Sequence, residues 1–297
     1  MRNFLIFLPL AFSLSSCALG CKSGLKSTYL RFRYESTIDK PVQNPSELTG
    51  YDIRLFQNSP VWNLAKAIEF EDMDEVLRIL KDEKVDVNYA TSKGGSTLLT
   101  YCIRTHDIVC VKNLLEYKAN PNHINNYGES LMILATGTTP EIVKLLLDYG
   151  GNPNLEMRKK ETNEIISTPL SMACRHGEFE IVNLLLAAGA DVNVKALALK
   201  EALTHNKMEI LLNLLKTGAD YRAKLDSVEG RGDLYIQDEL RFSLFQLDSK
   251  EYTQKMKVVD FLTKKGINYR ATPIPPYAYI EAKRRYPDTW KEYLEKY

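Results

Sequence analysis

Histidine and tryptophan are scarce in this chain, with 4 and 2 residues among 297. So few histidines leave little material for a multi-histidine metal centre, and we expect no bound metal and no cofactor. The chain also lacks an excess of one charge, because 39 lysines and arginines stand against 38 aspartates and glutamates. Binding to a nucleic acid backbone depends on surplus positive charge, so the composition argues against a nucleic acid partner.

Motifs of catalytic chemistry are also missing. No segment offers a nucleophile with its base, paired carboxylates, a glycine-rich phosphate loop or a metal cluster at a convincing spacing. The rest of the composition is that of an ordinary globular protein, with 44% hydrophobic and 26% charged residues. We therefore predict no catalytic residues and no enzyme activity, and an unrecognised active site is the alternative.

Residues 1–16 are typical of a secretory signal peptide. A cationic start at Arg2 precedes an apolar stretch over residues 4–14, which is too short to span a bilayer as a permanent helix. The sequence Leu-Ser-Ser-Cys at residues 14–17 resembles the lipobox of bacterial lipoproteins. This resemblance implies that Cys17 is lipidated and becomes the N-terminus of the mature chain.

The alternative is an ordinary signal peptide, cleaved near Ser16 or within residues 18–21, in which Cys17 is incidental. If Cys17 is lipidated, Ala18 follows it, and by resemblance to proteobacterial sorting rules this predicts an anchor on the periplasmic side of the outer membrane. Loss of Arg2 leaves 38 cations and 38 anions in the mature chain. A neutral chain needs its acyl groups to stay on the membrane.

A short motif recurs six times through the rest of the chain, at intervals of roughly 33 residues. Its clearest form is Gly-Ala-Asp-Val-Asn at residues 189–193. Twelve positions before the end of every copy stands an aliphatic residue or a cysteine, so the copies share one register. The other copies lie at residues 85–88, 119–122, 150–154, 218–222 and 266–270.

The most regular copy, residues 168–193, resembles an ankyrin repeat along its whole length. Thr168 suits the N-cap of a first helix, and Pro169 suits its first position, where no amide donor is needed. Gly189 suits the left-handed conformation that ends a second helix. The resemblance implies an all-α ankyrin-repeat solenoid over residues 59–271, with about six helix-turn-helix repeats and β-hairpin fingers.

Shorter segments flank the repeats. Residues 17–58 are expected to form a tether and an N-terminal cap, in which the alternating segments 29–34 and 51–56 resemble a pair of strands. Prolines end the repeat array, and residues 272–297 are expected to form a C-terminal helical cap. Its two short helices are predicted over residues 277–285 and 287–297.

The spacing of the motif predicts an insertion in the third hairpin. The copies ending at Asn154 and Asn193 are 39 residues apart, so residues 155–167 hold about six extra residues. A tolerated surface loop would explain them. Alternatively, a longer two-stranded finger enters a cleft on a partner, where the basic tip of Lys159 and Lys160 meets an acidic rim.

Three cysteines fall inside the repeats. Cys102 and Cys174 take positions where the family has small alanines, and Cys110 takes an aliphatic position. We interpret all three as buried apolar groups. A disulfide between Cys102 and Cys110, within one repeat, is the alternative in an oxidising compartment.

By register with the family, the exposed positions of the first helices and the hairpins should line a concave binding face. Tyrosine and arginine often anchor interfaces, so we expect this face to bind another protein. The alternative is that single tyrosines only fill gaps between irregular repeats. The predicted partner-binding residues are Tyr101, Arg104, Thr105, Tyr127, Arg175 and His176, with Met157, Arg158, Lys159, Lys160 and Glu164 on the third hairpin.

A lipid-anchored ankyrin protein resembles immunity proteins, which bind and block an interbacterial effector such as a phospholipase that acts in the periplasm. A periplasmic scaffold or protective partner of an envelope enzyme, for instance a catalase, is the alternative. In both cases we expect a module that is monomeric when free and that touches the membrane only through its lipid.

Overall fold

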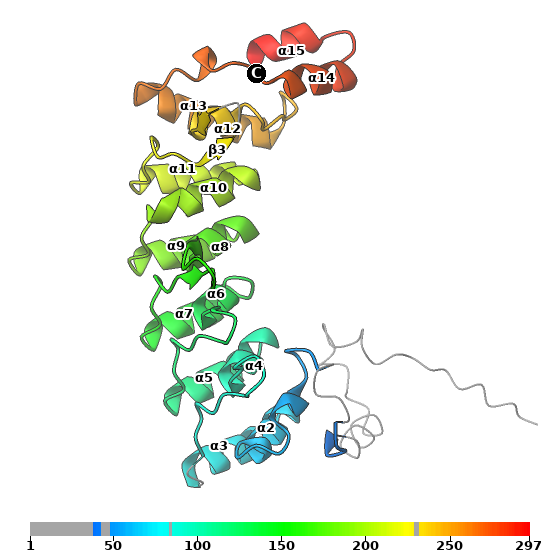
Figure 1. The fold of residues 1–297 in the computed structure, drawn as a ribbon, viewed down its shortest axis with the longest axis vertical. Coiled ribbons are helices and arrows are strands. Elements are labelled where there is room, and N and C mark those ends of the chain that lie inside the picture. Colours follow the sequence, from blue (N-terminus) through cyan, green and yellow to red (C-terminus); the bar gives the residue numbers. More distant parts are fainter. Residues whose placement is uncertain (1–37, 43–47, 83–84, 229–231) are drawn as a thin grey trace, which may run out of the picture.

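The computed structural model describes residues 38–42, 48–82, 85–228 and 232–297. Within these ranges, successive pairs of helices stack into a curved solenoid (Figure 1). The pairs are α2 (Trp62–Glu69) with α3 (Met73–Asp82), α4 (Leu98–Arg104) with α5 (Ile108–Glu116), α6 (Leu131–Ala135) with α7 (Pro140–Asp148), α8 (Pro169–His176) with α9 (Phe179–Ala187), α10 (Leu197–Thr204) with α11 (Met208–Lys216), and α12 (Ile236–Leu240) with α13 (Lys250–Lys264).

The helix starts follow from their capping residues. The Thr168 hydroxyl accepts a hydrogen bond from the Ser171 amide at 3.1 Å, and the Ser171 hydroxyl accepts one from the Thr168 amide at 2.9 Å. Pro169 then occupies the first turn of α8, and Gly177 ends the helix at a φ of 86°. The predicted start of this repeat is therefore confirmed, and its cause is a reciprocal capping box.

The last asparagine of the recurring motif joins neighbouring repeats. The Asn154 side chain accepts a hydrogen bond from the Asp191 amide at 2.8 Å and donates one to the Gly189 carbonyl at 3.0 Å. Asn122 bonds in the same way to the Asn152 amide and the Gly150 carbonyl. A side chain that bonds across the repeat boundary explains why asparagine recurs at this position.

The hydrophobic core runs without a break through the stacked pairs. Ile181, Val182 and Leu185 of α9 are 0% exposed and belong to the same cluster of buried residues as Ile53 near the N-terminal end. The C-terminal cap has a small cluster of its own, formed by α14 (Pro276–Arg285) and α15 (Trp290–Lys296). Both predicted C-terminal helices are therefore present.

Two hairpins extend from the solenoid. Strand β1 (Met157–Arg158) pairs antiparallel with β2 (Ile165–Ser167), and β3 (Asp226–Val228) pairs antiparallel with β4 (Gly232–Leu234). The first of them is the predicted two-stranded finger of the third hairpin. The described residues also form three short 3-10 helices, η3 (Ile53–Phe56), η4 (Val194–Ala196) and η5 (Tyr269–Ala271).

The prediction of strands in the N-terminal cap was wrong for residues 51–56. They contain the 3-10 helix η3, whose start is capped by the Asp52 carboxylate through the Arg54 amide at 3.0 Å. Ile53 and Phe56 are the two fully buried residues, and their spacing of three places both on one side of a helical turn. The other predicted strand, residues 29–34, lies outside the described residues.

The cysteine interpretation was wrong for one pair. Cys102 of α4 and Cys110 of α5 form a disulfide, with their Cα atoms 5.9 Å apart. The tight turn between the two helices of one repeat brings these positions within bonding reach. Cys174 stays a buried thiol as predicted, and burial raises its pKa to about 12.

None of the helices in the described ranges has the length and apolar character needed to cross a bilayer. The signal peptide and Cys17 lie outside those ranges.

Candidate protein-binding face

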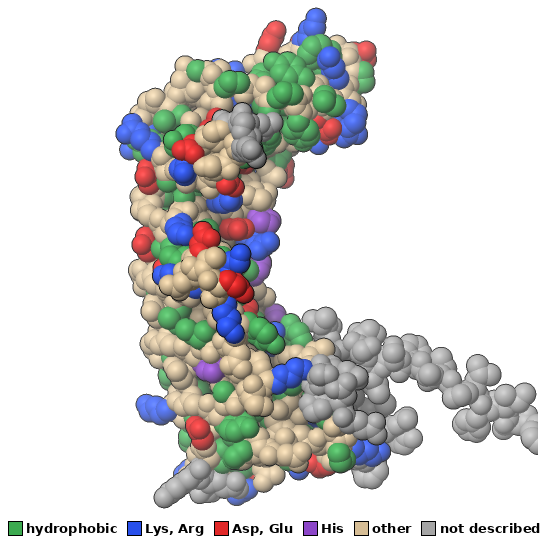
Figure 2. All heavy atoms as spheres, in the orientation of Figure 1, with side chains coloured by type: hydrophobic (Ala, Val, Ile, Leu, Met, Phe, Trp, Pro, Cys, Tyr) green, Lys and Arg blue, Asp and Glu red, His purple; other side chains and the backbone are tan. Residues whose placement is uncertain are grey.

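The solenoid is hollowed along one side, on which the inner helices α4, α6, α8 and α10 lie (Figures 1 and 2). We call this side, together with the hairpin tips beside it, the concave face. The composition of this face changes along the stack, and the predicted binding residues differ in exposure from one part to the next.

Gly50 and Tyr51, which precede α2, lie against Arg104 in the first part of the concave face. Tyr101 is only 2% exposed, and its hydroxyl donates a hydrogen bond to the Glu69 carboxylate. The prediction of Tyr101 as a partner-binding residue is therefore wrong. The helix α2 beside it supplies the partner that a buried phenol requires.

Arg104 is also occupied within the protein. Its Nη2 atom lies 3.3 Å from Glu129 Oε2, and its guanidinium lies 6.0 Å above the Tyr51 ring. The neighbouring Thr105 hydroxyl donates to the carbonyls of its own helix, at 3.1 Å to Tyr101. Both predicted residues are half-buried; Arg104 joins the N-terminal cap to the second hairpin, whereas Thr105 bonds only within its own helix.

Large apolar side chains are exposed on the second and third hairpins. Tyr127 is 69% exposed, as expected of a partner-binding residue, and Ile124 and Ile166 are 45% and 44% exposed. The backbones of the two hairpins lie close together at Gly128 and Arg158. A side chain added at Gly128 would place its Cβ atom 3.8 Å from the Arg158 carbonyl oxygen. Sequence reasoning missed the two isoleucines, because hairpin positions have no periodicity that separates inward from outward side chains.

The finger between β1 and β2 is braced on both sides. Arg158 forms an ion pair with Glu156, and Glu164 forms one with Lys195 of the next repeat at 3.2 Å. The Lys159 amide donates to the Glu164 carbonyl at 2.8 Å, and the Asn163 amide donates to the Lys159 carbonyl at 2.8 Å, which closes the loop. Two predicted contact residues, Arg158 and Glu164, thus form ion pairs within the protein.

The lysines at the finger tip stay available. Lys159 and Lys160 are exposed, and neither forms an ion pair within the described residues. Met157, by contrast, is half-buried at the base of β1. The finger therefore presents two unpaired cations on a braced support.

The centre of the concave face is polar, and histidine side chains gather there (Figure 2). Arg175 and His176 are exposed at the end of α8, as predicted. His176 Nδ1 lies 3.0 Å from the Thr136 carbonyl oxygen, whereas Arg175 and His205 lie 3.8 and 3.3 Å from the same Glu201 carboxylate. No group of three metal-ligating side chains occurs within the described parts of the chain.

Comparison with known families agrees with this architecture. The family described as ankyrin repeats matches residues 64–157 in three copies, and a single ankyrin repeat matches residues 167–197. The solenoid is an ankyrin-repeat fold. Ankyrin repeats mediate binding to other proteins, which is the role that exposed tyrosine, isoleucine and lysine side chains on the hairpins suit.

Several known proteins are similar to these ankyrin repeats. The ankyrin repeat protein YahD of Escherichia coli is 36% identical over 122 residues, covering 39% of this chain and 57% of that protein. An ankyrin repeat protein of Rickettsia felis is 30% identical over 134 residues, covering 45% of this chain and 42% of its own. The chain therefore spans about half the length of these relatives.

One solved structure is similar to part of the chain. The ankyrin repeat domain of human ASB11 superposes with a TM-score of 0.48 at 20% identity, covering 65% of this chain and 82% of that one.

Proposed function

We propose that this protein is a lipid-anchored binding module of the bacterial periplasm, an immunity protein that captures an interbacterial effector and blocks it. The observation that carries the proposal is the exposed surface on the second and third hairpins. Tyr127 and Ile124 are exposed on the second hairpin and Ile166 on the third, whose finger also carries the unpaired Lys159 and Lys160.

Such a surface has the make-up of an interface. Neighbouring exposed apolar side chains favour contact with another protein, because their burial removes apolar area from water. In protein interfaces, buried aromatic side chains supply much of the affinity, and charged side chains at the rim steer the encounter. The lysines predict that the partner presents acidic groups around the cleft that receives the finger.

Two features support the proposed location. The signal peptide and the lipobox around Cys17 direct the chain to the envelope by resemblance to bacterial lipoproteins. The disulfide between Cys102 and Cys110 fits an oxidising compartment such as the periplasm. An immunity protein has to stand where the effector arrives, and a lipid anchor holds it there.

The test is a variant that combines Tyr127→Ala with Lys159→Glu and Lys160→Glu. We expect it to lose most protection when a cognate effector is directed to the periplasm, because both the aromatic anchor and the steering charges are gone. Its matched control carries Lys112→Glu and Lys144→Glu on the exposed side of the outer helices α5 and α7. Equal protection by the two variants would overturn the proposal.

The neighbouring genes decide between partner classes. A gene for a secreted lipase or toxin supports the immunity proposal. A gene for a catalase or another envelope enzyme, with capture of that enzyme through Tyr127, would show instead that the same face serves a periplasmic scaffold or protective partner.

A further inference from the structure

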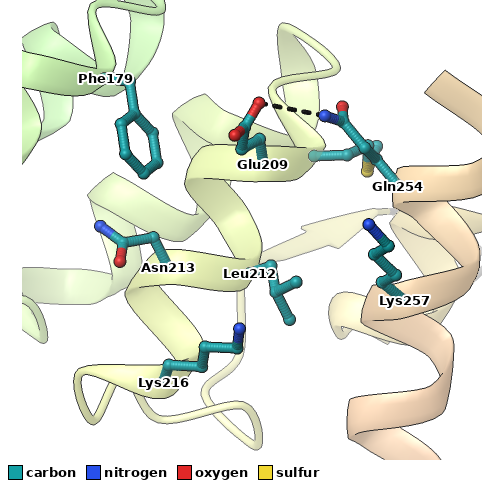
Figure 3. A pocket seen from close by; sticks show the side chains of 8 residues that line it. Phe179, Glu209, Leu212, Asn213, Lys216, Gln254 and Lys257 are labelled. Carbon is teal, nitrogen blue, oxygen red and sulfur yellow. Dashed lines mark hydrogen bonds between the residues drawn. The ribbon is translucent and has the colours of Figure 1, made fainter. Parts of the chain in front are cut away.

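A shallow groove lies on the outer side of the solenoid, among the outer helices α9, α11 and α13. Its volume is about 280 Å³. Figure 3 shows Phe179 reaching it from α9, Leu212 from α11 and Lys257 from α13. The concave face consists of the inner helices and hairpins, so the groove is a separate surface.

The groove combines an exposed ring with a recessed aliphatic side chain. Phe179, the first residue of α9, is 40% exposed, and Leu212 is half-buried. Met208, which occupies the corresponding position one repeat later and also lines the groove, is only 1% exposed. Phe179 therefore keeps apolar area in contact with water that a ligand in the groove would cover.

The rim of the groove is positively charged. Its one carboxylate, Glu209, accepts a hydrogen bond from the Gln254 side chain at 3.0 Å (Figure 3). Lys216 and Lys257 are exposed, and among the described residues no acidic side chain forms an ion pair with either of them. Lys257 lies on one face of α13 with the exposed Lys250 and Lys264, which recur every seven residues, and with the exposed Asp260 between the last two.

We propose that this groove is a second docking site and that its occupant is a short acidic, amphipathic segment of a partner protein. An aromatic or leucine side chain of that segment covers Phe179 and Leu212. Its flanking carboxylates bind Lys216 and Lys257, while Glu209 stays hydrogen-bonded to Gln254. The site goes beyond the proposed capture of an effector on the concave face, since none of its residues belongs to that face.

Other occupants fit less well. The N-terminal segment of this chain carries Lys22, Lys26, Arg31 and Arg33 within twelve residues, so like charges would repel it from the groove. A bilayer surface requires apolar side chains that protrude, whereas Leu212 lies recessed between two helices. An acidic segment of a protein can place an apolar side chain in the recess and its carboxylates beside the lysines.

The experiment measures fluorescence anisotropy of a labelled synthetic peptide in which phenylalanine and leucine alternate with aspartate and glutamate. We expect saturable binding to the lipid-free protein. The variant with Lys216→Glu and Lys257→Glu should bind at least about tenfold more weakly, and so should Phe179→Ala. The matched control with Lys159→Glu and Lys160→Glu should bind like the parent, because its charges lie on the finger.

Three results would overturn the proposal. The first is equal binding of a peptide with glutamine and asparagine in place of the acids. The second is unchanged binding by correctly folded Lys216→Glu, Lys257→Glu and Phe179→Ala proteins, with folding checked by circular dichroism. The third is absence of peptide binding together with Lys216-dependent binding to phosphatidylglycerol vesicles, which would assign the groove to a membrane. Failure of the concave-face variants to protect would leave this site unaffected.

Discussion

Lys255 shows how a single buried side chain can set the behaviour of the C-terminal part. It is 0% exposed in α13, where its Nζ atom donates to the Ser243 carbonyl at 3.1 Å and lies 3.7 Å above the Tyr297 ring. The guanidinium of Arg241 is buried close by, 4.1 Å from the Tyr269 ring. Burial, with the charge of Arg241, lowers the pKa of Lys255 to about 6.

A lowered lysine pKa makes stability depend on pH. An unfolded lysine has a pKa near 10.4, so between pH 6 and about 10 the unfolded state binds more protons than the folded state. The free energy of unfolding must therefore rise with pH in this window, by up to about 1.4 kcal/mol per pH unit. Below pH 6 lysine is protonated in both states, and this contribution to the slope ends.

We predict that Lys255→Met stabilises the protein by about 1–3 kcal/mol at pH 7, because an apolar chain of similar length replaces a poorly solvated amine. The variant should also flatten the rise in unfolding free energy between pH 6 and 9, as measured by denaturant titration at several pH values. Lys257→Met, at an exposed position of the same helix, is the control and should change neither quantity much. An unchanged pH slope in Lys255→Met would contradict the assignment.

The exposure of single residues could be predicted from the sequence only in part. The register of the repeats placed Arg175 and His176 on the surface correctly, because helix periodicity decides which side chains face the core. The same register placed Tyr101 on the surface, yet it is buried and its hydroxyl bonds to Glu69 of the preceding repeat. Irregular segments that pack over a repeat leave no periodic signal, so their effect on a neighbouring residue could not be predicted.

Among the elements, the finger of β1 and β2 adds nothing to the core of the solenoid. Its tip residues are exposed, and its ion pairs to Lys195 and Glu156 lie on the surface, where such pairs stabilise a protein by at most about 1 kcal/mol. The extra residues of the third hairpin therefore call for a reason other than stability.

We predict that cutting residues 157–164 back to a short turn shifts the melting temperature by only a few degrees, because little apolar area is lost. Affinity for the partner should fall, since the unpaired lysines of the tip are removed. Circular dichroism and calorimetric titration measure the two effects separately. If the shortened protein binds like the parent, the finger is a tolerated loop, and the interface has to be sought around Arg175 and His176.

Elements with a repeat signature could be predicted well. The capping pattern of Thr168 and Pro169 located the start of α8, and the spacing of 39 residues located the finger. The segment 51–56 could not be assigned, because buried Ile53 and Phe56 in a short alternating run suit a strand and a helical turn equally. The disulfide needed the distance between two helices, which spacing along the chain does not supply.

At the scale of the whole molecule, we propose a neutral, curved binding module on a lipid tether. We predict that Cys17→Ser abolishes acyl-chain labelling and releases the protein into the periplasmic fraction, because no net charge remains to hold it on lipid. Metabolic labelling with a fatty acid and cell fractionation measure both effects. Persistent labelling that depends on Cys21 would show that the other cysteine is the anchor.

The fold of the repeat array was predictable because every repeat follows the same local rules, and neighbouring repeats bury one another's apolar faces. The identity of the partner is not encoded in those rules. It depends on exposed side chains such as Tyr127, Ile124 and Lys160, which the solenoid tolerates in many combinations without any change of fold.

Site-specific photocrosslinking in living cells tests whether the concave face captures a protein in the envelope. A photoreactive phenylalanine analogue replaces Tyr127 on the second hairpin, and in a control it replaces Val109, which is 55% exposed on the outer helix α5. We predict a discrete crosslinked protein from position 127 and none from position 109. Crosslinking from position 109 alone, or of the same protein equally from both positions, would contradict it.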